Sequence, residues 1–116
     1  MQTRKLGRTD LHIPVIGLGP MFIGASAPDQ PGQHDEELAA ETVVAAIEAG
    51  STFIDTAPVY GGAKSERVIG RVLRERPDLA EKATVVTKAG ARPGERNFTY
   101  DAVMRHVGAS QERLGL

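Results

Sequence analysis

The chain has 116 residues, of which 41% are hydrophobic, a length that suits one domain with a buried core and excludes a two-domain enzyme. Its 14 Lys and Arg against 15 Asp and Glu give a net charge of -1, which argues against a nucleic-acid binding protein because such proteins need a basic surface. The lack of cysteine excludes disulfides, zinc-thiolate sites and thiol catalysis and predicts a cytoplasmic location, and no segment approaches the roughly 20 apolar residues of a membrane span.

The N-terminal residues predict a hairpin followed by a short strand. Residues 2–13 alternate loosely around the glycine-containing turn at 7–10, which is typical of a β-hairpin. The apolar run Val15–Leu18 predicts a buried strand that ends at Gly19. The Pro- and Gly-containing segment Pro20–His34 predicts a loop.

Two helices and a strand are expected next. Residues Asp35–Ala49 have acidic residues in the first turn and apolar residues at helical spacing, with Gly50 as the stop, which predicts a helix. Ser51–Ile54 predicts a second strand that leads directly into Asp55. Ser65 is a candidate N-cap for a second helix that ends near Pro77. Its apolar stripe consists of Val68, Ile69, Val72 and Leu73.

The remaining residues predict a third strand and helix. The β-branched run Thr84–Thr87 favours a strand, and residues 89–98 are rich in Gly, Pro and Arg and predict a loop. Thr99 is a candidate N-cap for a third helix with Gly115 as its stop. Val103, Val107 and Leu114 are expected on its buried side.

The order of elements predicts an α/β fold with parallel strands, since strands alternate with helices. We expect a single partial domain over residues 1–116, with a hairpin at 1–14 and three βα units at 15–116. Three units leave open sheet edges, which favour self-association or pairing with another chain.

Three polar residues follow the ends of predicted strands. Asp55 follows the second strand, Tyr60 lies in the next loop, and Lys88 follows the third strand. Because the ends of parallel strands meet at one face, these side chains are expected to converge. An ammonium group beside a phenol lowers its pKa from about 10 and suits it to donate a proton to a carbonyl oxygen. Taken singly, each residue is more simply a turn, loop or surface residue.

The same residues resemble a known family. The run Phe53–Gly61, followed by Ser65-Glu66 and Ile69-Gly70, is similar to the signature of the aldo-keto reductases. Residues 4–11, 15–19 and 85–88, together with the helix end at 110–115, also resemble that family. The resemblance covers essentially the whole chain.

The resemblance implies a (β/α)8 TIM barrel that uses NADP, with NAD as the alternative, and that reduces aldehydes or ketones or oxidises alcohols and sugars. It assigns Tyr60 as the general acid, Lys88 as the group that lowers the pKa of Tyr60, and Asp55 as the partner of Lys88. Gly19, Pro20 and Met21 would lie against the nicotinamide, with Asp55 near its ribose. Pro20 departs from the small polar residue usual at that position.

The resemblance also implies that parts of a complete enzyme lie outside these residues. The family's catalytic histidine follows a fourth strand, and the loops that hold the adenine follow the last strands, whereas a complete barrel needs about 250 residues. His106 is expected within the third helix as a packing or surface residue. The 116-residue chain alone is therefore expected to be inactive, and the alternative is a non-catalytic binding or assembly module built on a partial barrel.

Two further points concern ligands. Arg92 and Arg96 could meet an anionic substrate, although a solvated basic loop is the simpler interpretation. The three histidines are dispersed along the chain and predict no metal site.

Overall fold

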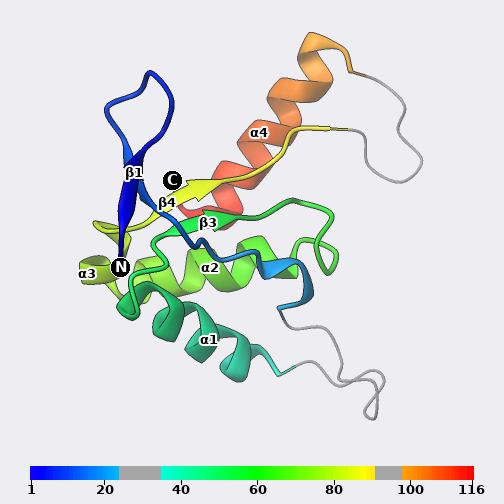
Figure 1. Ribbon diagram of the computed structural model, residues 1–116. Helices are drawn as coiled ribbons and strands as arrows, with labels where there is room; N and C mark the ends of the chain where they lie inside the picture. Colours follow the sequence, from blue (N-terminus) through cyan, green and yellow to red (C-terminus); the bar gives the residue numbers. More distant parts are fainter. Residues whose placement is uncertain (24–34, 91–97) are drawn as a thin grey trace.

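In the computed structural model, which describes residues 1–23, 35–90 and 98–116, short strands alternate with longer helices (Figure 1). The elements in chain order are β1 (Thr3–Lys5), β2 (His12–Pro14), the 3-10 helix η1 (Pro20–Phe22), α1 (Glu36–Glu48), β3 (Phe53–Asp55), α2 (Lys64–Glu75), α3 (Pro77–Ala80), β4 (Thr84–Val86) and α4 (Tyr100–Leu114). None of the helices in the described ranges is both long and apolar enough to cross a membrane.

The predicted N-terminal hairpin is present. Strands β1 and β2 pair antiparallel with Thr3 opposite Pro14, and Gly7 supplies the positive φ of +54° that the connecting turn needs. β1 is exposed throughout, β2 passes from exposed His12 to buried Pro14, and neither strand contributes a residue to the hydrophobic core cluster. The hairpin therefore lies apart from the core and contributes little to it.

The central sheet is parallel. β3 and β4 pair with Ile54 opposite Val85, and Leu18 joins the other edge of β3 through a single bridge to Ile54. The Leu18 N–H donates to the Phe53 carbonyl at 2.8 Å, and the Asp55 N–H donates to the Leu18 carbonyl at 3.0 Å. The expected order of parallel strands is thus present, although the first strand is reduced to one bridging residue.

The prediction of a buried strand over Val15–Leu18 is wrong for its first half. Val15 and Ile16 are 46% and 63% exposed. The Val15 N–H donates to the Gln2 carbonyl at 3.0 Å, so this residue continues the hairpin pairing instead of entering the central sheet. Only Leu18 packs against the core.

The helices bury one face of the central sheet. α2 packs against α1 on one flank and against α4 on the other, and Figure 1 shows α1 and α2 running alongside β3. The largest side chains of this core are fully buried: Val43 and Ile47 of α1, Ile54 of β3, Ile69 and Val72 of α2, and Leu79 of α3. Because successive strand residues point to opposite faces, this packing leaves Asp55 and Val86 on the exposed side.

Two of the three predicted helix starts are confirmed. The Asp35 side chain accepts from the Leu38 N–H at 2.9 Å, and the Thr99 hydroxyl accepts from the Ala102 N–H at 3.3 Å. The prediction that Ser65 caps α2 is wrong, because the N-cap is Ala63 with φ of +69°. The Ser65 hydroxyl is buried and bonds the Thr56 hydroxyl at 2.8 Å.

The buried face of α4 also differs from the prediction. Leu114 is buried as expected, but the other buried residues are Ala102, His106 and Ser110, and Val107 is exposed. The reason lies in the partner surface, since α2 presents Gly70 and a buried carboxylate to α4. Ser110 suits this end of the interface, because its hydroxyl accepts a hydrogen bond from the same Arg113 that bonds the carboxylate, while Val103 is half-buried.

Candidate functional site

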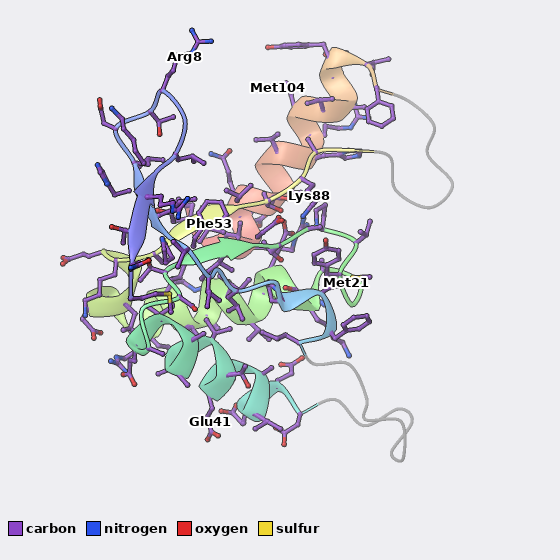
Figure 2. All side chains as sticks on the ribbon, in the orientation of Figure 1. Arg8, Met21, Glu41, Phe53, Lys88 and Met104 are labelled. Atoms are coloured by element: carbon purple, nitrogen blue, oxygen red, sulfur yellow. The ribbon has the colours of Figure 1, made fainter. Side chains whose placement is uncertain are left out.

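The ends of β3 and β4 bring two of the predicted residues to one edge of the sheet. Asp55, the last residue of β3, lies opposite Val86, the last residue of β4, and Lys88 follows two positions later. Figure 2 shows Lys88 on the side of the molecule where both strands run into loops. The parallel register therefore places the carboxylate within reach of the ammonium group.

The Lys88 ammonium is held by two oxygen atoms. Lys88 Nζ donates to Asp55 Oδ1 at 2.5 Å and to the Thr56 carbonyl oxygen at 2.9 Å. The Asp55 carboxylate raises the pKa of Lys88 above its usual value, burial opposes this, and the Tyr60 side chain adds a smaller increase. The Lys88 and Asp55 side chains are 48% and 53% exposed, so a ligand can reach both.

Tyr60 lies beside this pair. Lys88 Nζ is 5.0 Å from the centroid of the Tyr60 ring, within the range of a cation–π contact. The loop turns back immediately after Tyr60 through Gly61 and Gly62, whose φ angles are +58° and +63°. Glycine adopts this left-handed conformation without strain, whereas Ala63, the next residue, adopts it with φ of +69° at the start of α2. The three residues predicted from their strand-end positions thus lie together.

A hollow of about 300 Å³ opens beside these groups. Its walls are Ala57, Pro58, Val59, Tyr60, Lys88 and Gly90. Mostly apolar walls with one phenol and one ammonium are suited to a small carbonyl compound whose oxygen accepts a hydrogen bond.

The segment Gly19–Met21 lies next to the same strand end, because Leu18 is bonded to Phe53 and Asp55. Pro20 is buried at the start of η1, while Gly19 and Met21 are exposed. A Cβ added to Gly19 would have no atom within 4 Å. This open backbone beside the Asp55 carboxylate suits a flat ring and a sugar hydroxyl, so the residues present fit the nicotinamide and ribose end of a dinucleotide.

A buried polar layer behind the strand ends was missed by sequence reasoning. Glu66 of α2 is 0% exposed. Its two carboxylate oxygens accept from the Thr87 hydroxyl and from Nε of Arg113, each at 2.6 Å. The signal in the sequence is that Glu66 falls in line with Ile69 and Leu73, on the apolar stripe of the helix, where an unpaired charge would be costly.

The other candidate residues lie away from the site or outside the described ranges. His106 is buried in α4 and His12 lies in the exposed strand β2. His34, Arg92 and Arg96 fall within residues 24–34 and 91–97, which the structure does not describe. Across the described portions of the chain, no group of three or more His, Cys, Asp or Glu residues is arranged to hold a metal ion.

Comparison with known proteins identifies relatives of this chain. The model of the "Aldo/keto reductase family" matches residues 15–116. The chain is 30% identical to the NADH-specific methylglyoxal reductase of Escherichia coli K12, across 100% of this chain and 39% of that enzyme. It is 32% identical to the L-galactose dehydrogenase of Arabidopsis thaliana, across 100% of this chain and 35% of that enzyme.

Solved structures give the same result. A thermostable aldo-keto reductase crystallised with the inhibitor epalrestat superposes with a TM-score of 0.76 at 32% identity, over 99% of this chain and 39% of that one. The aldo-keto reductase AKR11C1 of Bacillus halodurans also gives a TM-score of 0.76, at 26% identity, over 99% of this chain and 37% of that one. The chain therefore spans well under half the length of the relatives it matches, and its fold is part of their (β/α)8 barrel, which these residues do not close.

Proposed function

Because the chain belongs to the aldo/keto reductase family, we propose that it carries part of the active site of a nicotinamide-dependent reductase that interconverts a carbonyl compound and an alcohol. The observation that carries the proposal is the contact of Lys88 Nζ with both the Asp55 carboxylate and the Tyr60 ring. A phenol and an ammonium beside an apolar hollow suit proton transfer to a carbonyl oxygen.

The roles of the three residues follow from their chemistry. The Tyr60 hydroxyl donates a proton to the substrate oxygen during reduction and accepts it back during oxidation. The positive charge of Lys88 favours the phenolate that is left behind. Asp55 keeps Lys88 protonated and oriented through the 2.5 Å hydrogen bond.

The nicotinamide cofactor supplies or accepts the hydride when it is bound. Gly19, Pro20 and Met21 would lie along its nicotinamide end, and Asp55 would accept a hydrogen bond from its ribose. NADP is the family-based choice, and the relative named as NADH-specific makes NAD the alternative. Measured NADPH and NADH turnover with the same aldehyde would decide between them.

The substrate class follows from the hollow and from the relatives. A hollow of about 300 Å³ with mostly apolar walls favours a small aldehyde, ketone, alcohol or sugar over a charged polymer. Relatives named for methylglyoxal reduction and L-galactose oxidation support a small carbonyl or sugar substrate. The zero cysteine count supports the cytoplasmic location that we propose for this reaction.

We also propose that the 116 residues alone do not catalyse the reaction. Among the described residues, the groups suited to a dinucleotide lie at its nicotinamide end. Lys88 is the only cation among the described residues that line the hollow beside Tyr60. NADPH-dependent reduction of an aldehyde by the purified 116-residue chain would contradict this proposal. A non-catalytic assembly module remains the second candidate, because Val86 leaves an apolar side chain on the open face of β4.

Substitution of Tyr60 tests the role of the phenol. In a complete barrel that contains this chain, Tyr60→Phe should lower the rate of reduction by about 10² to 10⁴, the usual contribution of a general acid. Cofactor binding, followed by NADPH fluorescence, should be unchanged. The matched control is Tyr100→Phe, because Tyr100 is 77% exposed at the start of α4. Equal activities of the two variants would refute the role of Tyr60.

A further inference from the structure

Two adjacent residues of α2 reach the two strand ends that carry the Asp55–Lys88 pair. Ser65 bonds the side chain of Thr56, and Glu66 bonds the side chain of Thr87. Thr56 directly follows Asp55, and Thr87 directly precedes Lys88. Asp55 and Lys88 therefore each adjoin a threonine whose side chain is hydrogen-bonded to the first turn of α2.

The first of these contacts acts on the Asp55 side. The Ser65 and Thr56 hydroxyls are 2.8 Å apart and both side chains are fully buried. Thr56 also donates its N–H to the Val86 carbonyl at 2.8 Å, and its own carbonyl accepts from Lys88 Nζ at 2.9 Å. The Ser65 hydroxyl thus holds Thr56, whose backbone carbonyl accepts a hydrogen bond from Lys88.

The second contact acts on the Lys88 side. The Thr87 hydroxyl donates to Glu66 Oε1 at 2.6 Å, while Arg113 of α4 donates to Glu66 Oε2. Lys88 Nζ takes no part in these two hydrogen bonds of Glu66, so the effect of Glu66 on Lys88 passes through the backbone between Thr87 and Lys88. Adjacent residues of an extended chain point to opposite sides, so a Thr87 side chain held toward the helices directs Lys88 toward the open face.

We propose that Ser65 and Glu66 form a positioning pair that sets the geometry of the Asp55–Lys88 contact by holding Thr56 and Thr87. The inference deepens the proposed function, because it assigns to α2 the support of that same site. Arg113 neutralises the Glu66 carboxylate, so the pair holds a hydroxyl at each strand end without an unpaired buried charge.

Competitive amine labelling of the 116-residue chain tests the pair without substrate or cofactor. The reactivity of Lys88 relative to Lys82 is measured by mass spectrometry after brief acetylation of the folded chain. A loosened contact exposes more free amine at Lys88, whereas Lys82, which follows α3, serves as the internal reference. Thr87→Val removes the hydroxyl held by Glu66 and keeps the β-branched shape, and Ser65→Ala removes the hydroxyl held by Thr56.

We expect each variant to raise the Lys88 to Lys82 labelling ratio by about threefold, because a looser contact with Asp55 lowers the pKa of Lys88 and leaves more free amine. Thr87→Ser keeps the hydroxyl and should restore the parental ratio. The matched control is Thr84→Val, the same substitution at the opposite end of β4, which should leave the ratio unchanged. If Thr87→Val alters the circular dichroism spectrum of the folded chain, Thr87→Ala takes its place.

An unchanged ratio in Thr87→Val or in Ser65→Ala overturns the positioning pair, as does an equal rise in Thr84→Val. The test is separate from that of the proposed function. A normal reduction rate in Tyr60→Phe would refute the reductase mechanism and leave the labelling result intact, whereas an unchanged labelling ratio would refute the pair and leave the reductase mechanism intact.

Discussion

At the level of single residues, we expect the Asp55–Lys88 contact to serve the proposed chemistry of the site more than the stability of the fold. Both side chains are about half exposed, and ion pairs of this kind contribute about 0 to 1 kcal/mol. The pair nevertheless raises the pKa of Lys88, which keeps the ammonium charged beside Tyr60. Its main effect is therefore to keep a positive charge on Lys88, next to the Tyr60 phenol and to any ligand bound at this edge of the sheet.

The raised pKa of Lys88 predicts how Asp55→Asn depends on pH. A lysine whose pKa is higher in the folded than in the unfolded chain stabilises the fold below the ordinary pKa of 10.5 and loses that contribution as the pH rises through the raised value. Asp55→Asn should therefore lower the free energy of unfolding by less than about 1 kcal/mol at pH 8. The difference should shrink above the ordinary lysine pKa. Urea titrations at neutral and alkaline pH measure it, and a difference that grows with pH would contradict this account.

The candidate site residues were predictable to the extent that strand ends determine them. Asp55 and Lys88 follow β-branched or apolar runs, and a parallel register brings such positions to one edge. The supporting roles of Ser65 and Glu66 were not predictable in this way. A serine at the start of a helix is typical of a cap, and only the approach of β3 to α2 shows that its hydroxyl bonds Thr56.

At the level of elements, the α2–α4 interface depends on a single glycine. A Cβ at Gly70 would lie 2.0 Å from the Arg113 carbonyl oxygen and 2.9 Å from the Leu114 Cα. Both are backbone atoms, so no rotamer change could make room for it. Arg113 of α4 also donates to Glu66 near the start of α2, so any separation of α2 from α4 would strain that bond as well.

Gly70→Ala should therefore destabilise the chain despite the better helix propensity of alanine. The propensity gain is about 1 kcal/mol, whereas forcing extra volume into a packed interface costs about 1 to 3 kcal/mol or more, so we expect a net loss. The matched control is Gly108→Ala in α4, where an added Cβ meets nothing within 4 Å. That variant should gain up to about 1 kcal/mol. Urea denaturation measures both, and equal stabilisation by the two alanines would refute the role assigned to Gly70.

The elements that the sequence predicted well are those with a local signal. Thr99 caps its helix as expected, and the helix predicted from Asp35 begins at Glu36 with Asp35 as its N-cap, since each helix start depends on residues within one turn. The strand at Val15–Leu18 and the buried face of α4 were predicted less well. Both depend on distant partners, namely Gln2 for Val15 and the packed surface of α2 for α4, and hydrophobic spacing carries no information about such partners.

At the level of the whole molecule, the helices of the described residues cover one side of the central sheet. The other side presents Val86, which is 39% exposed, beside Asp55. Within the described ranges, β4 pairs with β3 alone and its other edge has no strand partner. Unpaired edges with apolar side chains favour pairing with further strands. In the reductases that this chain resembles, the chain covers 37% to 39% of the solved polypeptides, and the rest of the barrel provides such strands.

The purified 116-residue chain should therefore self-associate through the edge of β4. Its sedimentation coefficient should rise with concentration, and Val86→Lys should suppress the rise because a charge on an edge strand opposes strand pairing. Val107→Lys is the matched control, since Val107 is also exposed but lies on α4, away from the sheet. A chain that stays monomeric at every concentration would contradict the prediction. Equal suppression by Val86→Lys and Val107→Lys would show that self-association depends on exposed apolar surface in general and not on the edge of β4.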